Sequence, residues 1–184
     1  MTIDKNKTLL AIYIIVFGSL FTMMLGFSFK FSSIFRTTDP GFAFVKQGIY
    51  GSILIALIHL SNLKNFIFGV FSLLIFTIVL FKITDFGIIL SRFLYLSALA
   101  TAIFIYHNYY YNKLNNLAFG KFIPLSGLLY ISFLIVTIIV ALLANEPNFR
   151  QVIFDFAGYG FIIGTGIGIG FELSLPLKKL VTVE

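Results

Sequence analysis

Long runs of apolar residues alternate along the chain with short polar segments. The first run extends from Thr8 to Phe29 without a charged side chain, and it is longer than the apolar core of about 7–15 residues in a signal peptide. A helix that crosses the hydrocarbon core of a bilayer needs about 20 apolar residues in succession. We therefore expect a retained first helix and five further crossings. The expected spans cover residues 8–29, 44–62, 65–81, 86–108, 122–144 and 152–175.

The composition supports the same interpretation. Of the 184 residues, 59% are hydrophobic and 11% are charged, and the mean hydropathy is +1.03. A soluble domain has about 25% charged residues, and a chain of this size cannot bury so much apolar surface in its own core. The sequence therefore predicts an all-α protein, a polytopic membrane helix bundle that forms a single integral membrane domain over residues 1–184.

The charged residues flank the apolar runs. The net charge is +6, but Lys and Arg stand singly at the ends of the runs, as in membrane-flanking segments, and form no basic patch for nucleic acid. They are shared almost evenly between the two sides, and we expect both termini in the cytoplasm, in an inner or plasma membrane. The chain has no cysteine, which excludes disulfides, thiolate metal sites and cysteine nucleophiles.

The sixth run contains a dense set of glycines. If this run is helical, Gly160, Gly164 and Gly168 form one ridge, and Gly166 and Gly170 lie roughly on the opposite side. Small residues spaced four apart let two helices approach closely in lipid. Two such ridges predict a central helix packed between two neighbours. The alternative is a broken helix whose backbone groups line a polar site.

Arg92 is the most informative charged residue. Thr84 or Asp85 can cap a helix that begins at Phe86. Arg92 then lies about 10 Å inside the span, where a charge is costly unless it is paired or hydrated. Either its guanidinium sits among the headgroups, or it contacts an anion or a substrate. Asp85, two turns earlier, and Asp155, at the start of the sixth span, are its candidate partners.

Three polar residues join Arg92 and Asp85 as candidates for binding a substrate or an ion. Asp155 and Glu172 stand near opposite ends of the sixth span, and buried carboxylates in membranes often bind protons or cations. Hydrated end groups are the alternative for both. Gln47 stands in the first turn of the second span with Tyr50 and Ser52 nearby, and such side chains commonly hydrogen-bond to a neighbouring helix.

His59 and His107 are the only histidines in the chain. Each stands near the end of an even-numbered span, so both belong to the same leaflet. Two histidines on neighbouring helices can ligate one haem, which makes this pair candidate haem ligands. The tyrosines at 109–111 favour instead a histidine at the membrane interface. Neither histidine has the cysteine or acidic neighbours that would complete a zinc site.

Three functions remain open at this point. The leading hypothesis is a small transporter, or the substrate-binding membrane subunit of a transport system. The alternatives are a non-catalytic structural or accessory subunit of a larger membrane complex, and a haem- or quinone-linked electron-transfer subunit. We find no catalytic constellation and expect no enzyme. Apart from haem in the last hypothesis we expect no cofactor. The expected partners are the lipid bilayer and either another membrane protein or a second copy of the chain, not nucleic acid.

Overall fold

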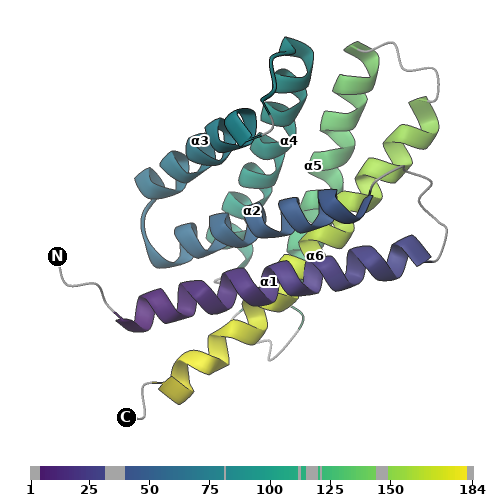
Figure 1. Cartoon of the computed structure of the whole chain (residues 1–184). Coiled ribbons are helices and arrows are strands. Elements are labelled where there is room, and N and C mark those ends of the chain that lie inside the picture. The colour runs from purple at the N-terminus through teal and green to yellow at the C-terminus, as the bar shows by residue number, and fades with distance from the viewer. Residues whose placement is uncertain are drawn as a thin grey trace.

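The fold is helical throughout the part of the chain that the structure describes, apart from short turns. This computed structural model describes residues 5–31, 40–80, 82–111, 113–114, 120, 122–143 and 149–181. Its helices are α1 (Lys5–Phe31), α2 (Pro40–Leu60), α3 (Leu63–Leu80), α4 (Phe86–Ile105), α5 (Phe122–Leu143) and α6 (Phe149–Val181), and a π-helix, η1 (Tyr106–Tyr111), continues α4 (Figure 1). The predicted all-α bundle is confirmed.

Five of the helices are long and apolar enough to cross a bilayer. These candidate spans are Asn6–Ser28, Leu63–Leu80, Phe86–Tyr111, Phe122–Leu143 and Val152–Pro176. Within the described residues α2 is not among them, so the second crossing stays a prediction. The protein is a helical membrane bundle.

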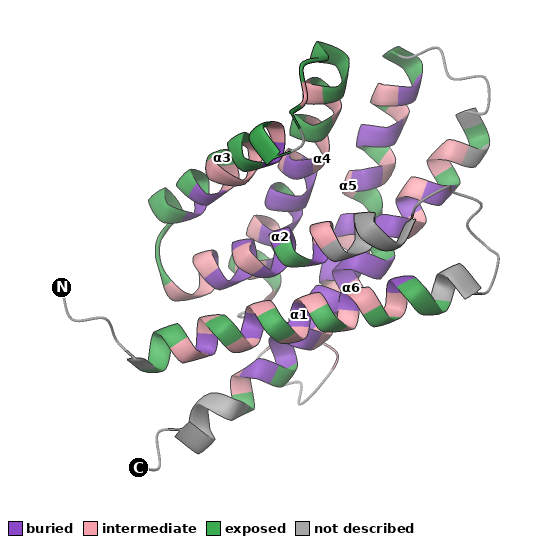
Figure 2. Cartoon of the chain, in the orientation of Figure 1, coloured by how far each residue is buried: buried purple, intermediate pink, exposed green. Residues whose placement is uncertain are grey.

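The glycine-rich helix α6 lies at the centre of this bundle. It packs against α1 on one side and against α5 on the other, and buried residues run along most of its middle turns (Figure 2). The helices α2 and α4 complete the surroundings, and α3 lies at the edge, against α2 and α4 (Figure 1). This arrangement confirms the central position that the sequence predicted for the sixth helix.

The two glycine ridges of α6 face these two neighbours. A methyl group at Gly160, Gly164 or Gly168 would come within 3.0 Å of atoms of α5. A methyl group at Gly166 or Gly170 would come within 3.0 Å of atoms of α1. Side-chain carbons essentially never approach other atoms so closely, so these contacts require glycine unless the helices move apart. The ridges therefore set the distance between α6 and both partners.

Small residues also join α1 to α2. A methyl group at Gly48 would meet Thr22 of α1, and one at Gly18 would meet Ser52 of α2. The hydroxyl of Thr22 donates to the Gly18 carbonyl oxygen (2.7 Å). The hydroxyl of Ser52 donates to the Gly48 carbonyl oxygen (2.6 Å). Both hydroxyls are buried and hydrogen-bonded within their own helices. The interface therefore buries these two hydroxyls without leaving their hydrogens unpaired.

The sixth helix is continuous and longer than expected. The sequence ends the sixth span at Leu175, before Pro176, but α6 runs from Phe149 to Val181 with Pro176 inside it. A proline removes one backbone hydrogen bond and crowds the preceding turn, and α6 accommodates it close to its C-terminal end. The continuity of α6 also excludes the alternative of a broken helix.

The fourth helix begins where the sequence predicts and ends in an unusual turn. Asp85 is its N-cap, and Asp85 Oδ1 accepts a hydrogen bond from the backbone N–H of Ile88 (3.0 Å). At the other end, the π-helix η1 carries the chain on to Tyr111. Such turns insert one extra residue per hydrogen-bonded ring and are frequent at functional sites. The turn carries His107, one of the candidate site residues.

Candidate functional site

Four buried side-chain atoms lack a hydrogen-bond partner in the part of the chain that the structure describes. They are Gln47 Oε1, Tyr106 Oη, His107 Nδ1 and Glu172 Oε1. Buried polar atoms are nearly always hydrogen-bonded, so each exception marks a place where a water, an ion or a proton can bind. Gln47 belongs to one end of the bundle. The other three atoms belong to the opposite end, near His59, which lies about 18 Å further along α2 than Gln47.

Gln47 lines a small pocket that two cationic side chains share. The residues of this cationic pocket are Lys46, Gln47, Tyr50, Leu74, Thr77, Arg92 and Leu96. Lys46 of α2 and Arg92 of α4 line the same pocket, and their like charges repel each other there. None of the described residues that line the pocket is a carboxylate, and the free volume of about 10 Å³ is close to what one water molecule needs. The pocket therefore combines positive charge with room for a small occupant.

A hydrogen bond between α2 and α3 fixes one wall of the cationic pocket. Tyr50 Oη lies 2.7 Å from Thr77 Oγ1. The Thr77 hydroxyl donates its hydrogen to the Leu73 carbonyl oxygen (2.7 Å), so Tyr50 is the donor in the pair. Because the Tyr50 hydrogen is used in this way, the Tyr50 hydroxyl has no hydrogen left to donate to an occupant of the pocket.

The two acidic residues considered as partners of Arg92 lie elsewhere. Asp85 caps α4 through the N–H of Ile88, and the structure records no ion pair between Asp85 and Arg92. Asp155 is buried, with 6% of its surface exposed, but it is not among the residues that line the cationic pocket. It stands eleven residues before Gly166 on α6, and so on the side of that helix that faces α1. Arg92 thus meets Lys46 rather than a carboxylate.

The structure brings the two histidines together at the opposite end of the bundle. They belong to a histidine cluster, which consists of His59, Tyr106, His107, Tyr111, Phe171 and Glu172. His59 Nδ1 lies 3.3 Å from His107 Nε2, a hydrogen bond between α2 and η1. The ring of Tyr111 stacks on His107 at 5.7 Å between centroids and 12° between planes. The ring of Phe171 meets His59 edge-on at 5.0 Å. Two aromatic rings therefore hold the imidazole pair in place.

Glu172 adds a carboxylate to this cluster. It is 9% exposed, and its Oε2 accepts a hydrogen bond from the backbone N–H of Gly120 (3.1 Å). Gly120 has a φ of +100°, a conformation that favours glycine. Glu172 also lies close enough to Tyr106 and Tyr111 to act on their hydroxyls electrostatically. The carboxylate thus ties α6 to the start of α5, and its other oxygen, Oε1, has no partner.

The histidine pair in this arrangement does not fit a haem. Two haem ligands hold the iron and the flat macrocycle between their rings. Here the two nitrogens are at hydrogen-bond distance from each other, and the rings of Tyr111 and Phe171 both pack against His59. The described residues also contain no group of three or more His, Asp or Glu side chains placed to hold a metal ion. The geometry favours a direct imidazole–imidazole hydrogen bond.

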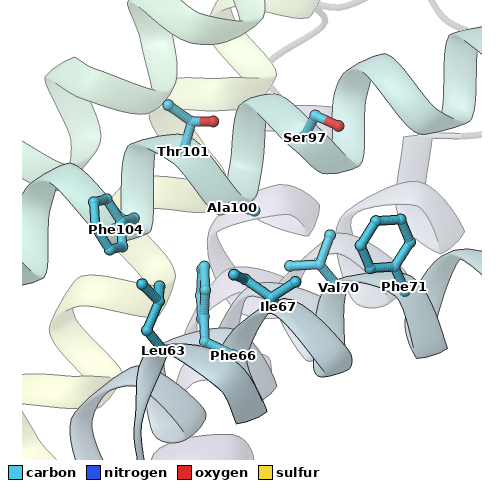
Figure 3. Close-up of a pocket in the computed structure, with 9 residues that line it drawn as sticks. All are labelled: Leu63, Phe66, Ile67, Val70, Phe71, Ser97, Ala100, Thr101 and Phe104. Atoms are coloured by element: carbon cyan, nitrogen blue, oxygen red, sulfur yellow. The ribbon is translucent and has the colours of Figure 1, made fainter.

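A third hollow lies between α3 and α4 and is apolar (Figure 3). Its volume is about 320 Å³, and its lining residues are Leu63, Phe66, Ile67, Val70, Phe71, Ser97, Ala100, Thr101 and Phe104. None of these is charged, and the only hydroxyls are those of Ser97 and Thr101. Such a lining recognises hydrocarbon and not a charged solute, so this hollow is not a candidate for binding an ion.

Comparison with known proteins assigns no family. No protein-family model matches the chain, and no curated protein and no solved structure is significantly similar to it. The function has to be argued from the two polar sites themselves.

Sequence reasoning named some residues of these sites and missed others. Gln47, Arg92, Glu172 and the two histidines are candidates from the sequence. Lys46 is not, because a lysine in the first turn of the span expected at 44–62 gives no signal of its own. The helix begins earlier, at Pro40, which places Lys46 two turns inside it. Tyr106 gave no separate signal, because a tyrosine at the end of a span usually belongs to the interfacial belt.

Proposed function

We propose that this membrane bundle is a small transporter, or the substrate-binding membrane subunit of a transport system, and that its substrate is a small inorganic anion. The observation that carries the proposal is the approach of Lys46 on α2 to Arg92 on α4 in one pocket beside Gln47. These side chains come from two different helices, so their meeting is a property of the fold and not of one basic segment.

The electrostatics of the cationic pocket favour an anion. Two positive charges at short range repel each other, and the repulsion is stronger in a medium of low dielectric constant than in water. An anion between Lys46 and Arg92 replaces this repulsion by two attractions. A charge-assisted hydrogen bond contributes about 1.5–3 kcal/mol, more than a bond between neutral groups.

The size of the pocket limits the occupant. A free volume of about 10 Å³ accepts one water-sized group. A halide, or one oxygen of an oxyanion such as phosphate, is of this size, whereas a vitamin or an amino acid would require the helices to separate. Among the functions considered from the sequence, transport of a small anion makes the best use of these residues.

The test is an anion flux measurement in reconstituted vesicles, with chloride and phosphate as the probes. We expect vesicles that contain the protein to release at least one of these anions faster than protein-free vesicles of the same lipid. Arg92→Ala should lower that rate at least about tenfold, since each tenfold change corresponds to 1.4 kcal/mol. Arg92→Lys, which keeps the charge, should retain more of the rate than Arg92→Ala.

A matched control uses an exposed cation away from the pocket. Lys113 is exposed after η1, at the other end of the bundle, so Lys113→Ala should leave the flux unchanged. Equal rates for the native protein and Arg92→Ala would overturn the proposal, as would the absence of protein-dependent flux of both anions.

A further inference from the structure

The histidine cluster concentrates unsatisfied polar atoms in a buried place. Tyr106 Oη, His107 Nδ1 and Glu172 Oε1 are all buried and have no hydrogen-bond partner among the described residues. They come from two distant parts of the chain, η1 and the C-terminal half of α6. A single unsatisfied atom is commonplace, but three in one cluster indicate a site whose hydrogen-bonding groups are arranged for something that binds there.

Among the residues that the structure describes, the buried charges of this cluster do not balance. Glu172 is the acidic member, and both imidazoles are neutral in their unprotonated form. The described cations on the elements that pack at this end are Lys7 on α1, Lys64 on α3 and Lys113 after η1, and all three are exposed. A buried carboxylate with no buried countercharge is strongly unfavourable. A positive charge inside the cluster would remove this imbalance.

We propose that the histidine cluster is a proton-binding site, in which His59 and His107 share one bound proton and Glu172 supplies the countercharge. The pair is already hydrogen-bonded, with His59 Nδ1 at 3.3 Å from His107 Nε2. Protonation turns this contact into a charge-assisted hydrogen bond, which is the stronger kind. Histidine is the side chain whose charge changes between about pH 5 and 8.

The surrounding rings suit an imidazolium. The ring of Tyr111 lies nearly parallel to that of His107, with 12° between the planes and 5.7 Å between the centroids, and a cation beside an aromatic face is attracted to it. Glu172 lies one residue after Phe171, whose ring packs on both His59 and Tyr111. These ring contacts join the histidine pair to Tyr111 and Phe171, and Glu172 follows Phe171 directly on α6. This proposal does not depend on anion binding at the other end of the bundle.

The test is a histidine-specific NMR titration, which is clean because His59 and His107 are the only histidines. The protein carries ¹⁵N only in its histidine rings, is held in lipid nanodiscs, and is titrated from about pH 8 to pH 5. We expect both rings to change together at one midpoint, because they share the same proton. Two rings that titrate independently, or rings that stay neutral over the whole range, would overturn the proposal.

Variants show whether the two histidines share one proton or whether the protein responds to low pH in another way. Glu172→Gln removes the countercharge and should abolish the joint protonation over the same pH range. Asp155→Asn alters a buried carboxylate of the same helix outside the cluster and should leave the titration unchanged. In His59→Asn, the remaining His107 should titrate alone. If Glu172→Gln does not fold, the native titration and the His59→Asn variant still decide the question.

Discussion

His59 and His107 meet through Nδ1 and Nε2 at 3.3 Å although 48 residues separate them in the sequence. The contact joins the end of α2 to the π-turn that follows α4, and the rings of Tyr111 and Phe171 pack against His59 beside it. Because the imidazoles bond to each other, we expect no bis-histidine haem in the folded protein. Addition of haemin to the purified protein should give no low-spin haem spectrum at stoichiometric amounts. A sharp Soret band that disappears in His107→Ala would show that the pair binds haem after all.

The glycine ridges of α6 predict a large contrast between two similar substitutions. Gly164→Ala places a methyl group 2.7 Å from the Cα of Ser126, so α5 and α6 must separate. Such overpacking costs about 1–3 kcal/mol in stability. Gly127→Ala is the control, because Gly127 lies in α5 with no atom within 4 Å of the added methyl. There the gain in helix propensity should stabilise the protein by about 0.5–1 kcal/mol. Unfolding in a denaturing detergent measures the stability of both variants. Equal stabilities of Gly164→Ala and Gly127→Ala would contradict this packing.

The bond between Tyr50 and Thr77 can be measured as a coupling energy. A double-mutant cycle of Tyr50→Phe and Thr77→Val should give about 0.6 kcal/mol, the average for hydrogen bonds between membrane helices. The control cycle combines Tyr50→Phe with Thr137→Val, since Thr137 bonds to Tyr95 instead (2.9 Å). This control should show no coupling. A coupling of zero in the first cycle would indicate that α2 and α3 are not joined beside Gln47.

The role of Asp85 distinguishes a helix cap from an ion pair. Asp85 is the N-cap of α4, so Asp85→Ala should lower the free energy of unfolding of the protein by about 1 kcal/mol. Asp85→Asn should retain most of the stability, because asparagine caps helices about as well as aspartate. If both variants lost the same stability, the charge would be the important property, and a partner such as Arg92 would have to be considered again.

The sequence predicted the helices well because bilayer crossing imposes a simple pattern. Uncharged runs marked the spans, and the spacing of Gly160, Gly164 and Gly168 against Gly166 and Gly170 indicated a helix packed on two sides. These properties depend only on residues within one helix, so they can be read without knowing the neighbours.

The sites were harder to predict because they depend on how helices are rotated against each other. Nothing in the sequence pairs Lys46 with Arg92, since that contact requires α2 and α4 to present particular faces at the same depth. The π-turn that carries His107 shifts the side chains after it by a fraction of a turn. Such small changes decide which residues meet, and they leave no trace in hydrophobic periodicity.

The most direct test of an anion site between Lys46 and Arg92 is a crystal structure of the protein grown with bromide, located by its anomalous scattering. We expect a bromide peak in the cationic pocket, in contact with both side chains and beside Gln47, and its loss in crystals of Arg92→Ala. A native structure with bromide at other positions and none in this pocket would contradict the account.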